Sequence, residues 1–96
     1  MRKLEGEIVD SQLKETLESM HLSTISDESS QLLFPIPVTR KVYLLKVNDE
    51  YRAAITFADA PNIPKGTRVT IEEQGKILKK YFLKTDEQKI PLIYFL

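Results

Sequence analysis

Apolar and polar residues alternate along residues 64–83 in the pattern expected of a β-hairpin. Residues 68–72 place their apolar members on one face of an extended strand. Gly75 favours a turn over residues 73–76, because glycine adopts a positive φ at no steric cost. The pattern therefore predicts a return strand over residues 76–83, and the rest of the chain must cover the apolar face of this hairpin.

A second hairpin is predicted from residues 40–47 and 51–57, which are rich in β-branched and aromatic side chains. The intervening residues 48–50 (Asn-Asp-Glu) are typical of a tight turn. Alternation places four residues of the second strand on one face: Tyr51, Ala53, Ile55 and Phe57. Several alanines also permit a helix over residues 49–60, but the alternation favours a strand.

The beginning of the chain predicts a short strand and then one helix. Residues 4–9 alternate, and Asp10 or Ser11 is suited to cap a helix over residues 12–21. The apolar stripe of that helix would be formed at helical spacing by Leu13, Leu17 and Met20. Residues 23–30 are rich in serine, threonine and acids, which predicts a polar loop.

Two further segments are strongly apolar. Residues 31–38 contain Pro35 and Pro37, which cannot donate hydrogen bonds to a sheet, so an edge strand or an extended segment is expected. Such a segment either packs on its own domain or docks as a peptide on another protein. Residues 90–96 are expected to form a sheet strand or an interface element.

Six or seven short strands with frequent turns predict a mainly-β fold, a small antiparallel β-barrel of the OB-like or SH3-like kind with one N-terminal helix. The 96 residues are expected to form a single domain. Within it, residues 1–30 would form the helix and a polar loop as a leader, and residues 31–96 would form the barrel.

The composition argues against an enzyme. The chain has no cysteine and one histidine, His21, so thiol catalysis and the common zinc sites are excluded. No serine lies in a Gly-x-Ser-x-Gly turn, and the three glycines are too dispersed for a phosphate-binding loop. We therefore expect no catalytic residues, no metal and no cofactor.

The formal charge is zero, but it is unevenly distributed. Residues 1–39 carry 3 cations and 7 anions, a net charge of −4, and residues 40–96 carry 11 cations and 7 anions, a net charge of +4. The acidic part is either a solvated face or a segment that lies across the basic part. No apolar stretch reaches the roughly 20 residues of a membrane span and no signal peptide is evident, so a cytoplasmic protein without membrane contact is expected.

Two binding hypotheses follow. Lysines and aromatics interleave over residues 76–84, as in small barrels that bind single-stranded nucleic acid by stacking and phosphate neutralisation. The predicted nucleic-acid-binding residues are Lys79, Lys80, Tyr81, Phe82, Lys84, Arg40, Lys41 and Arg52. Alternatively, the lysines only protect an edge strand from aggregation.

The second hypothesis is a protein-interaction subunit or homodimer, with a protein or a second copy as its partner. It would use the apolar segments 31–38 and 90–96, which a small barrel cannot easily cover alone. The predicted interface residues are Phe34, Ile36, Ile93, Tyr94 and Phe95.

A local resemblance involves the run Pro64-Lys-Gly-Thr-Arg-Val-Thr-Ile-Glu-Glu-Gln-Gly-Lys-Ile-Leu-Lys-Lys80. It resembles the closing hairpin of swapped-hairpin transcription regulators and antitoxins of the AbrB type, and it is equally similar to a hairpin in OB-type domains of NfeD-like proteins. Val38-Thr39-Arg40-Lys41 also resembles the opening of the regulator family. The Gly-Gln-Val-Thr-Ile-Pro run that follows in that family is replaced here by Val42-Tyr-Leu-Leu, so no functional residues are carried over.

Overall fold

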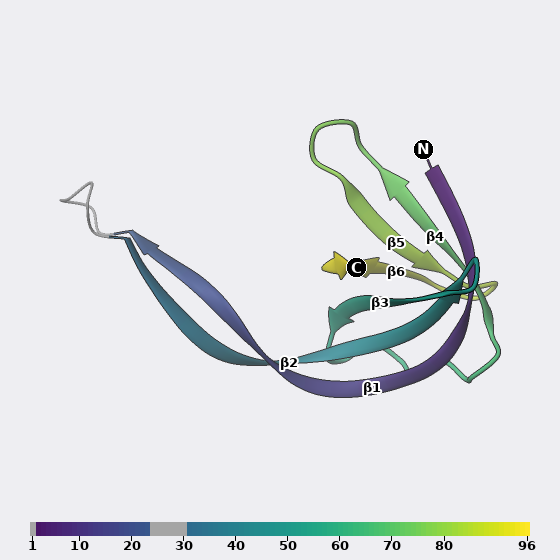
Figure 1. Ribbon diagram of the computed structural model, residues 1–96, viewed down its shortest axis with the longest axis horizontal. Coiled ribbons are helices and arrows are strands. Elements are labelled where there is room, and N and C mark those ends of the chain that lie inside the picture. Colours follow the sequence, from purple (N-terminus) through teal and green to yellow (C-terminus); the bar gives the residue numbers. More distant parts are fainter. Residues whose placement is uncertain (1, 24–30) are drawn as a thin grey trace.

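The computed structural model describes residues 2–23 and 31–96, and the side chains of residues 2–18 and 35–96. These residues form one antiparallel sheet in the strand order β6-β5-β4-β1-β2-β3-β7 (Figure 1). The strands are β1 (Arg2–Ser23), β2 (Gln31–Val47), β3 (Glu50–Phe57), β4 (Arg68–Gln74), β5 (Lys80–Lys84), β6 (Lys89–Leu92) and β7 (Tyr94–Phe95). The mainly-β, antiparallel prediction is therefore confirmed.

The predicted N-terminal helix is wrong, because residues 12–21 belong to β1. Each of these residues lies opposite a residue of β2 in an uninterrupted antiparallel register. A helix this short is marginal without packing, whereas the ladder with β2 satisfies the backbone groups on one edge of this segment along its whole length. The predicted loop over residues 23–30 lies outside the described residues apart from Ser23.

The predicted helix cap is a β-bulge instead. The register of β1 against β2 shifts between Ile8 and Asp10. Beside the bulge, the Ser11 hydroxyl donates to the Ile63 carbonyl at 3.0 Å and accepts from the Ile63 N–H at 3.1 Å. Of the two residues that fit a helix cap, Ser11 therefore anchors the loop between β3 and β4 onto β1, whereas Asp10 accepts from the neighbouring Ser11 N–H and the Gln12 side chain.

The sheet is strongly curved, but it is not closed into the predicted barrel. Strands β6 and β7 occupy its opposite edges, although only Ile93 separates them in the chain. The Ile93 N–H donates to the Ile55 carbonyl at 2.8 Å, and the Thr56 hydroxyl donates to the Pro91 carbonyl at 2.6 Å. Individual bonds from one C-terminal segment, rather than a continuous strand ladder, draw the two edges together.

Both predicted hairpins exist. Asn48 (φ 48°) and Asp49 (φ 66°) form a two-residue turn with the positive dihedrals of type I′, and residues 50–57 are a strand rather than a helix. Gly75 has the expected positive φ of 93°. The return strand begins only at Lys80, however, so residues 75–79 form a longer loop than predicted.

The core lies on the concave side of the sheet and draws on most of the chain. Its buried apolar residues are Ile8, Tyr43, Leu45, Val47, Ala54, Ile63, Val69, Ile71, Leu83 and Ile90. Tyr43 is fully buried and donates to the Pro61 carbonyl at 2.6 Å, and burial raises its pKa to about 12. On β3 the core side chains are Ala54 and Thr56, so the apolar set that includes Tyr51 and Phe57 faces outward.

Strands β1 and β2 continue as a two-stranded ribbon past the rest of the sheet, which we call the body (residues 2–14 and 40–96) (Figure 1). Strand β4 pairs with β1 only over residues 2–7, and β3 pairs with β2 only from Arg40 onward. We call residues 15–23 and 31–39 the arm. Its β2 strand carries Pro35 and Pro37 and pairs only with β1 among the described strands, which confirms the edge assignment. The described residues contain no helix with the length and apolar character needed to cross a membrane.

Candidate binding surfaces

The structure brings parts of both predicted sites into one groove, which we call the aromatic groove. It has a volume of about 320 Å³ and is lined by residues 79–82 and residues 91–96. The pairing of β5 with β6 causes this, because Tyr81 lies opposite Leu92 and Phe82 lies opposite Pro91. Four predicted nucleic-acid residues thus meet the predicted interface residues Ile93, Tyr94 and Phe95.

The rings in the aromatic groove are partly engaged with each other. Tyr81 and Phe95 have centroids 5.6 Å apart and a tilt of 44°. The Arg52 guanidinium lies 4.1 Å from the Phe95 centroid, and its Nε donates to the Leu96 carbonyl at 3.0 Å. Arg52 therefore supports the C-terminal strand, and its position beside Phe95 favours a structural contribution over a free phosphate contact.

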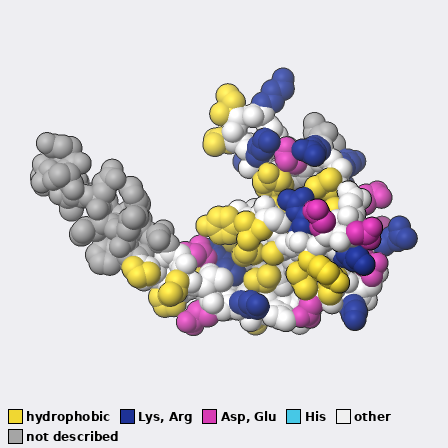
Figure 2. All heavy atoms as spheres, viewed as in Figure 1, with side chains coloured by type: hydrophobic (Ala, Val, Ile, Leu, Met, Phe, Trp, Pro, Cys, Tyr) yellow, Lys and Arg dark blue, Asp and Glu magenta, His cyan; other side chains and the backbone are white. Residues whose placement is uncertain are grey.

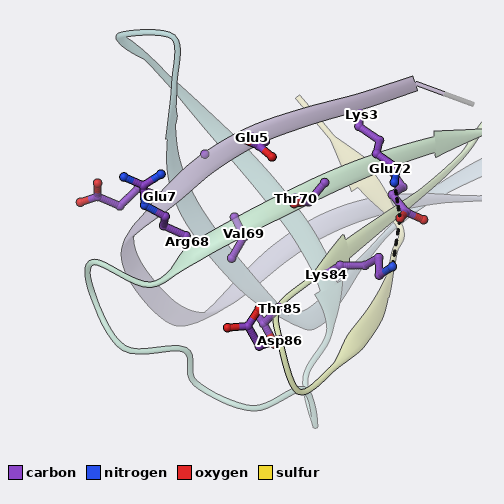
Figure 3. Close-up of a pocket in the computed structure, with 11 residues that line it drawn as sticks. Lys3, Glu5, Glu7, Arg68, Val69, Thr70, Glu72, Lys84, Thr85 and Asp86 are labelled. Carbon is purple, nitrogen blue, oxygen red and sulfur yellow. Dashed lines mark ion pairs between the residues drawn. The ribbon is translucent and has the colours of Figure 1, made fainter.

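Lysines around Glu72 form a separate cluster on the outer side of β1, β4, β5 and β6. The Glu72 carboxylate is 4% exposed and lies 3.2 Å from Lys84 Nζ, 3.9 Å from Lys3 Nζ and 4.0 Å from Lys89 Nζ. Figure 3 shows Lys3 and Lys84 converging on Glu72 from opposite sides. Lys84 is thus engaged by a carboxylate, which the sequence prediction did not foresee.

Lys84, Lys89 and Lys3 favour the ionised form of Glu72. Burial alone would raise its pKa, but the Lys84 hydrogen bond and the charges of Lys84, Lys89 and Lys3 lower the pKa below its ordinary value of 4.5. The Lys89 ammonium also lies 4.5 Å from the Phe82 ring centroid. Lys89 therefore already covers part of one face of the Phe82 ring.

The two predicted basic residues on β2 are also engaged. Arg40 donates to Glu18 from Nε at 2.7 Å and from a terminal nitrogen at 3.0 Å, and this hydrogen bond lowers the pKa of Glu18. Lys41 is 4% exposed and bonds the Asn62 side chain.

Lys79 lies 3.4 Å from Glu73, whereas Lys80 is exposed and makes no ion pair within the described residues. The predicted basic surface is thus divided among four places.

Another groove, of about 600 Å³, lies beside the Glu72 cluster and is charged but not basic. Its charged lining comprises three cations and four anions: Lys3, Arg68, Lys84, Glu5, Glu7, Glu72 and Asp86. This balance does not favour an anionic ligand. Within the described part of the chain, no group of three His, Cys, Asp or Glu side chains is arranged to hold a metal ion.

An apolar surface on the convex side of the sheet was missed by the sequence analysis. Its exposed members are Leu44 (37%), Tyr51 (64%), Phe57 (52%), Tyr94 (46%) and Leu96 (66%). Cross-strand register joins them, because Leu44 lies opposite Ala53 and Tyr94 lies opposite Ile55. We call this set, with Val42, Ala53 and Ile55, the outer face.

Exposed hydrophobic side chains also occur on the β4–β5 loop, where Ile77 and Leu78 are 94% and 81% exposed. Figure 2 shows hydrophobic side chains on the body and on this loop. Ile36, of the predicted interface, is half-buried on the arm, whereas the side chain of Phe34 lies outside the described side chains. The outer face takes its C-terminal members from β7 and Leu96, and the described side chains of residues 35–38 are not among its members.

The missed surface had a signal in the sequence. Residues 42–45 (Val-Tyr-Leu-Leu) are apolar on both faces of the strand, which is more than one core requires.

The chain matches no protein-family model, no curated protein and no solved structure. No family match therefore extends the local resemblance of residues 64–80, and the function is argued from the chain's own residues.

Proposed function

We propose that this chain is a non-enzymatic protein-interaction subunit that docks a partner protein on its outer face. The observation that supports it is the continuous run of exposed apolar side chains across β2, β3 and β7. A soluble monomer rarely leaves such a contiguous apolar surface open to water. The predicted nucleic-acid-binding lysines and arginines argue for the same choice, since all of them except Lys80 already contact another side chain of the chain.

The outer face has the composition of a protein interface. Tyr51, Phe57 and Tyr94 are aromatic, the class most enriched in interface hot spots. Arg40 borders the face. Its guanidinium lies 5.9 Å from the Phe57 centroid and forms an ion pair with Glu18. Lys46 lies opposite Tyr51 at the other end. An apolar centre with charged residues at its rim is the usual organisation of a binding interface.

A photo-crosslinking amino acid placed at Phe57 in the full chain tests the proposal in the source cells. A discrete adduct with one protein is expected, and it should disappear when Tyr94→Glu is added. The matched control carries the same probe at Ile77, which is apolar and 94% exposed but lies outside the outer face. No adduct at Phe57, or the same adducts from both positions, would refute the proposal.

A second candidate is single-stranded nucleic acid in the aromatic groove. It is favoured by the presence of Lys79 and Lys80 in the same groove as Tyr81, Phe82 and Phe95. Fluorescence anisotropy with a labelled single-stranded oligonucleotide should then show binding that weakens steeply with salt.

The paired change Lys79→Glu and Lys80→Glu should abolish that binding. A control that reverses the charge of Lys65, an exposed lysine in the β3–β4 loop, should retain most of it. Equal losses from both variants would show only a general charge effect and would remove the aromatic groove as a site.

A further inference from the structure

The edge of β1 in and beside the arm is an unpaired strand edge. Strand β1 pairs with β4 only as far as Glu7, and Ser11 is covered by the loop that it anchors at Ile63. From Gln12 to Glu18, β1 pairs with β2 on one side and with no other described strand on its second side. Unpaired backbone groups along a strand edge are a template for pairing with another chain.

The opposite edge of the arm is blocked. Pro35 and Pro37 are two residues apart, so their nitrogens face the same edge of β2. A proline in a ladder is tolerated where its missing N–H points away from the partner strand, which leaves the outer edge of β2 without two donors. Only the β1 edge of the arm is therefore suited to receive an added strand.

The charges along this edge favour a second copy of the chain as the added strand. Lys14, Thr16 and Glu18 alternate onto one face of β1. Lys14 lies opposite Arg40, a like charge, and makes no ion pair within the described residues. Glu18 already engages Arg40, so an anion supplied from across the open edge would give Lys14 its own partner.

We propose that two copies pair antiparallel through residues 12–18 of β1, with Thr16 opposite Thr16 of the second copy. In this register Lys14 of each copy lies opposite Glu18 of the other, and no like charges are opposed. A register centred on residue 15 would place Glu15 opposite Glu15 of the second copy. A register centred on residue 14 would place Lys14 opposite Lys14. A register centred on residue 17 would leave Lys14 without an opposite charge across the edge.

The second face of the joined ribbon is completed by leucine. Leu13 and Leu17 are 58% and 74% exposed in the single chain. In the proposed register Leu17 lies diagonal to Leu13 and Leu17 of the second copy, within reach of contact. The four strands β2-β1-β1-β2 then form one antiparallel sheet, which is more stable in water than an isolated two-stranded ribbon. This inference goes beyond the proposed function, because the dimer uses the edge of β1 and leaves the outer face free for a partner protein.

Because the chain has no cysteine, Thr16→Cys introduces a single thiol on the proposed two-fold axis. Opposed residues in an antiparallel pair have Cα atoms about 4.5–5.5 Å apart, within the range of a disulfide. Mild oxidation should convert this variant largely to a covalent dimer. The control Thr39→Cys lies on the proline-bearing strand and should stay monomeric. Equal crosslinking of the two variants would overturn the inference.

A charge exchange provides the second test. Lys14→Glu and Glu18→Lys should each lose self-association, measured by light scattering, by at least about tenfold because two cross-strand pairs change sign together. An equimolar mixture of the two variants should associate again, since every opposed pair is then complementary. A mixture that remains monomeric would refute the register. If both tests fail while the probe at Phe57 still forms its adduct, the dimer is refuted and the proposal of docking on the outer face stands.

Discussion

The body and the arm are built from the same two strands but are held in different ways. In the body, β1 and β2 are flanked by β4 and β3, and Ile8, Tyr43 and Leu45 are fully buried. In the arm, the strands pair only with each other among the described residues, and Leu17 is 74% exposed. The arm is held by the hydrogen bonds between its two strands and by any chain that packs on it. The body is stabilised by the burial of its hydrophobic core.

The same substitution in the two regions should give the largest contrast. Leu45→Ala removes a fully buried side chain and should lower the free energy of unfolding by about 2–5 kcal/mol. Leu17→Ala should change it by no more than about 0.5 kcal/mol in the monomer, because this side chain is mostly in water already. Urea unfolding of both variants measures the difference. Similar losses would mean that the arm shares the core.

A second comparison uses the two glycines with positive φ. A Cβ at Gly75 (φ 93°) would lie 2.2 Å from the Leu78 carbonyl oxygen, whereas at Gly66 (φ 91°) it would meet nothing within 4 Å. Gly75→Ala should therefore cost roughly 1–3 kcal/mol. Gly66→Ala should cost only the backbone penalty of roughly 1 kcal/mol. Thermal unfolding gives both values, and a reversed order would contradict the description of the β4–β5 loop.

The Glu72 cluster predicts an acid-sensitive body. Because the folded pKa of Glu72 lies below its ordinary value of 4.5, its ionised form stabilises the fold above that pH. The contribution should fall as pH decreases below 4.5 and passes through the lower folded pKa. Glu72→Gln should flatten this part of the stability–pH curve measured by urea unfolding. An unchanged curve would show that the three lysines do not stabilise the carboxylate.

The smallest effect is expected in the arm. Glu18 and Arg40 join the arm to the body through a bidentate hydrogen bond. Glu18→Gln keeps the size of the side chain but removes the charge, so only the amides of the arm should exchange faster with deuterium. Amides of the core strands, such as those near Leu83, serve as the internal control. Faster exchange throughout would indicate that the arm and the body unfold together.

The wrong helix prediction and the dispersal of the predicted basic residues over the structure have a common cause. The helix over residues 12–21 was inferred from a leucine spacing that also fits an extended ribbon, and only the pairing with residues 33–42 decides between them. The basic surface was inferred from lysine and arginine positions on single strands. Glu72, Glu18 and Asn62, which engage Lys84, Arg40 and Lys41, come from other parts of the chain.

The sequence by itself determined the two hairpins, since alternation, an Asn-Asp turn and Gly75 act within a few residues. It also determined that Tyr51, Ile55 and Phe57 share a face. Only the tertiary structure decided that this face points outward and that the lysines are engaged by acids. The reason is that burial and ion pairing depend on strands distant in sequence, and local patterns carry no information on which of those strands will be neighbours.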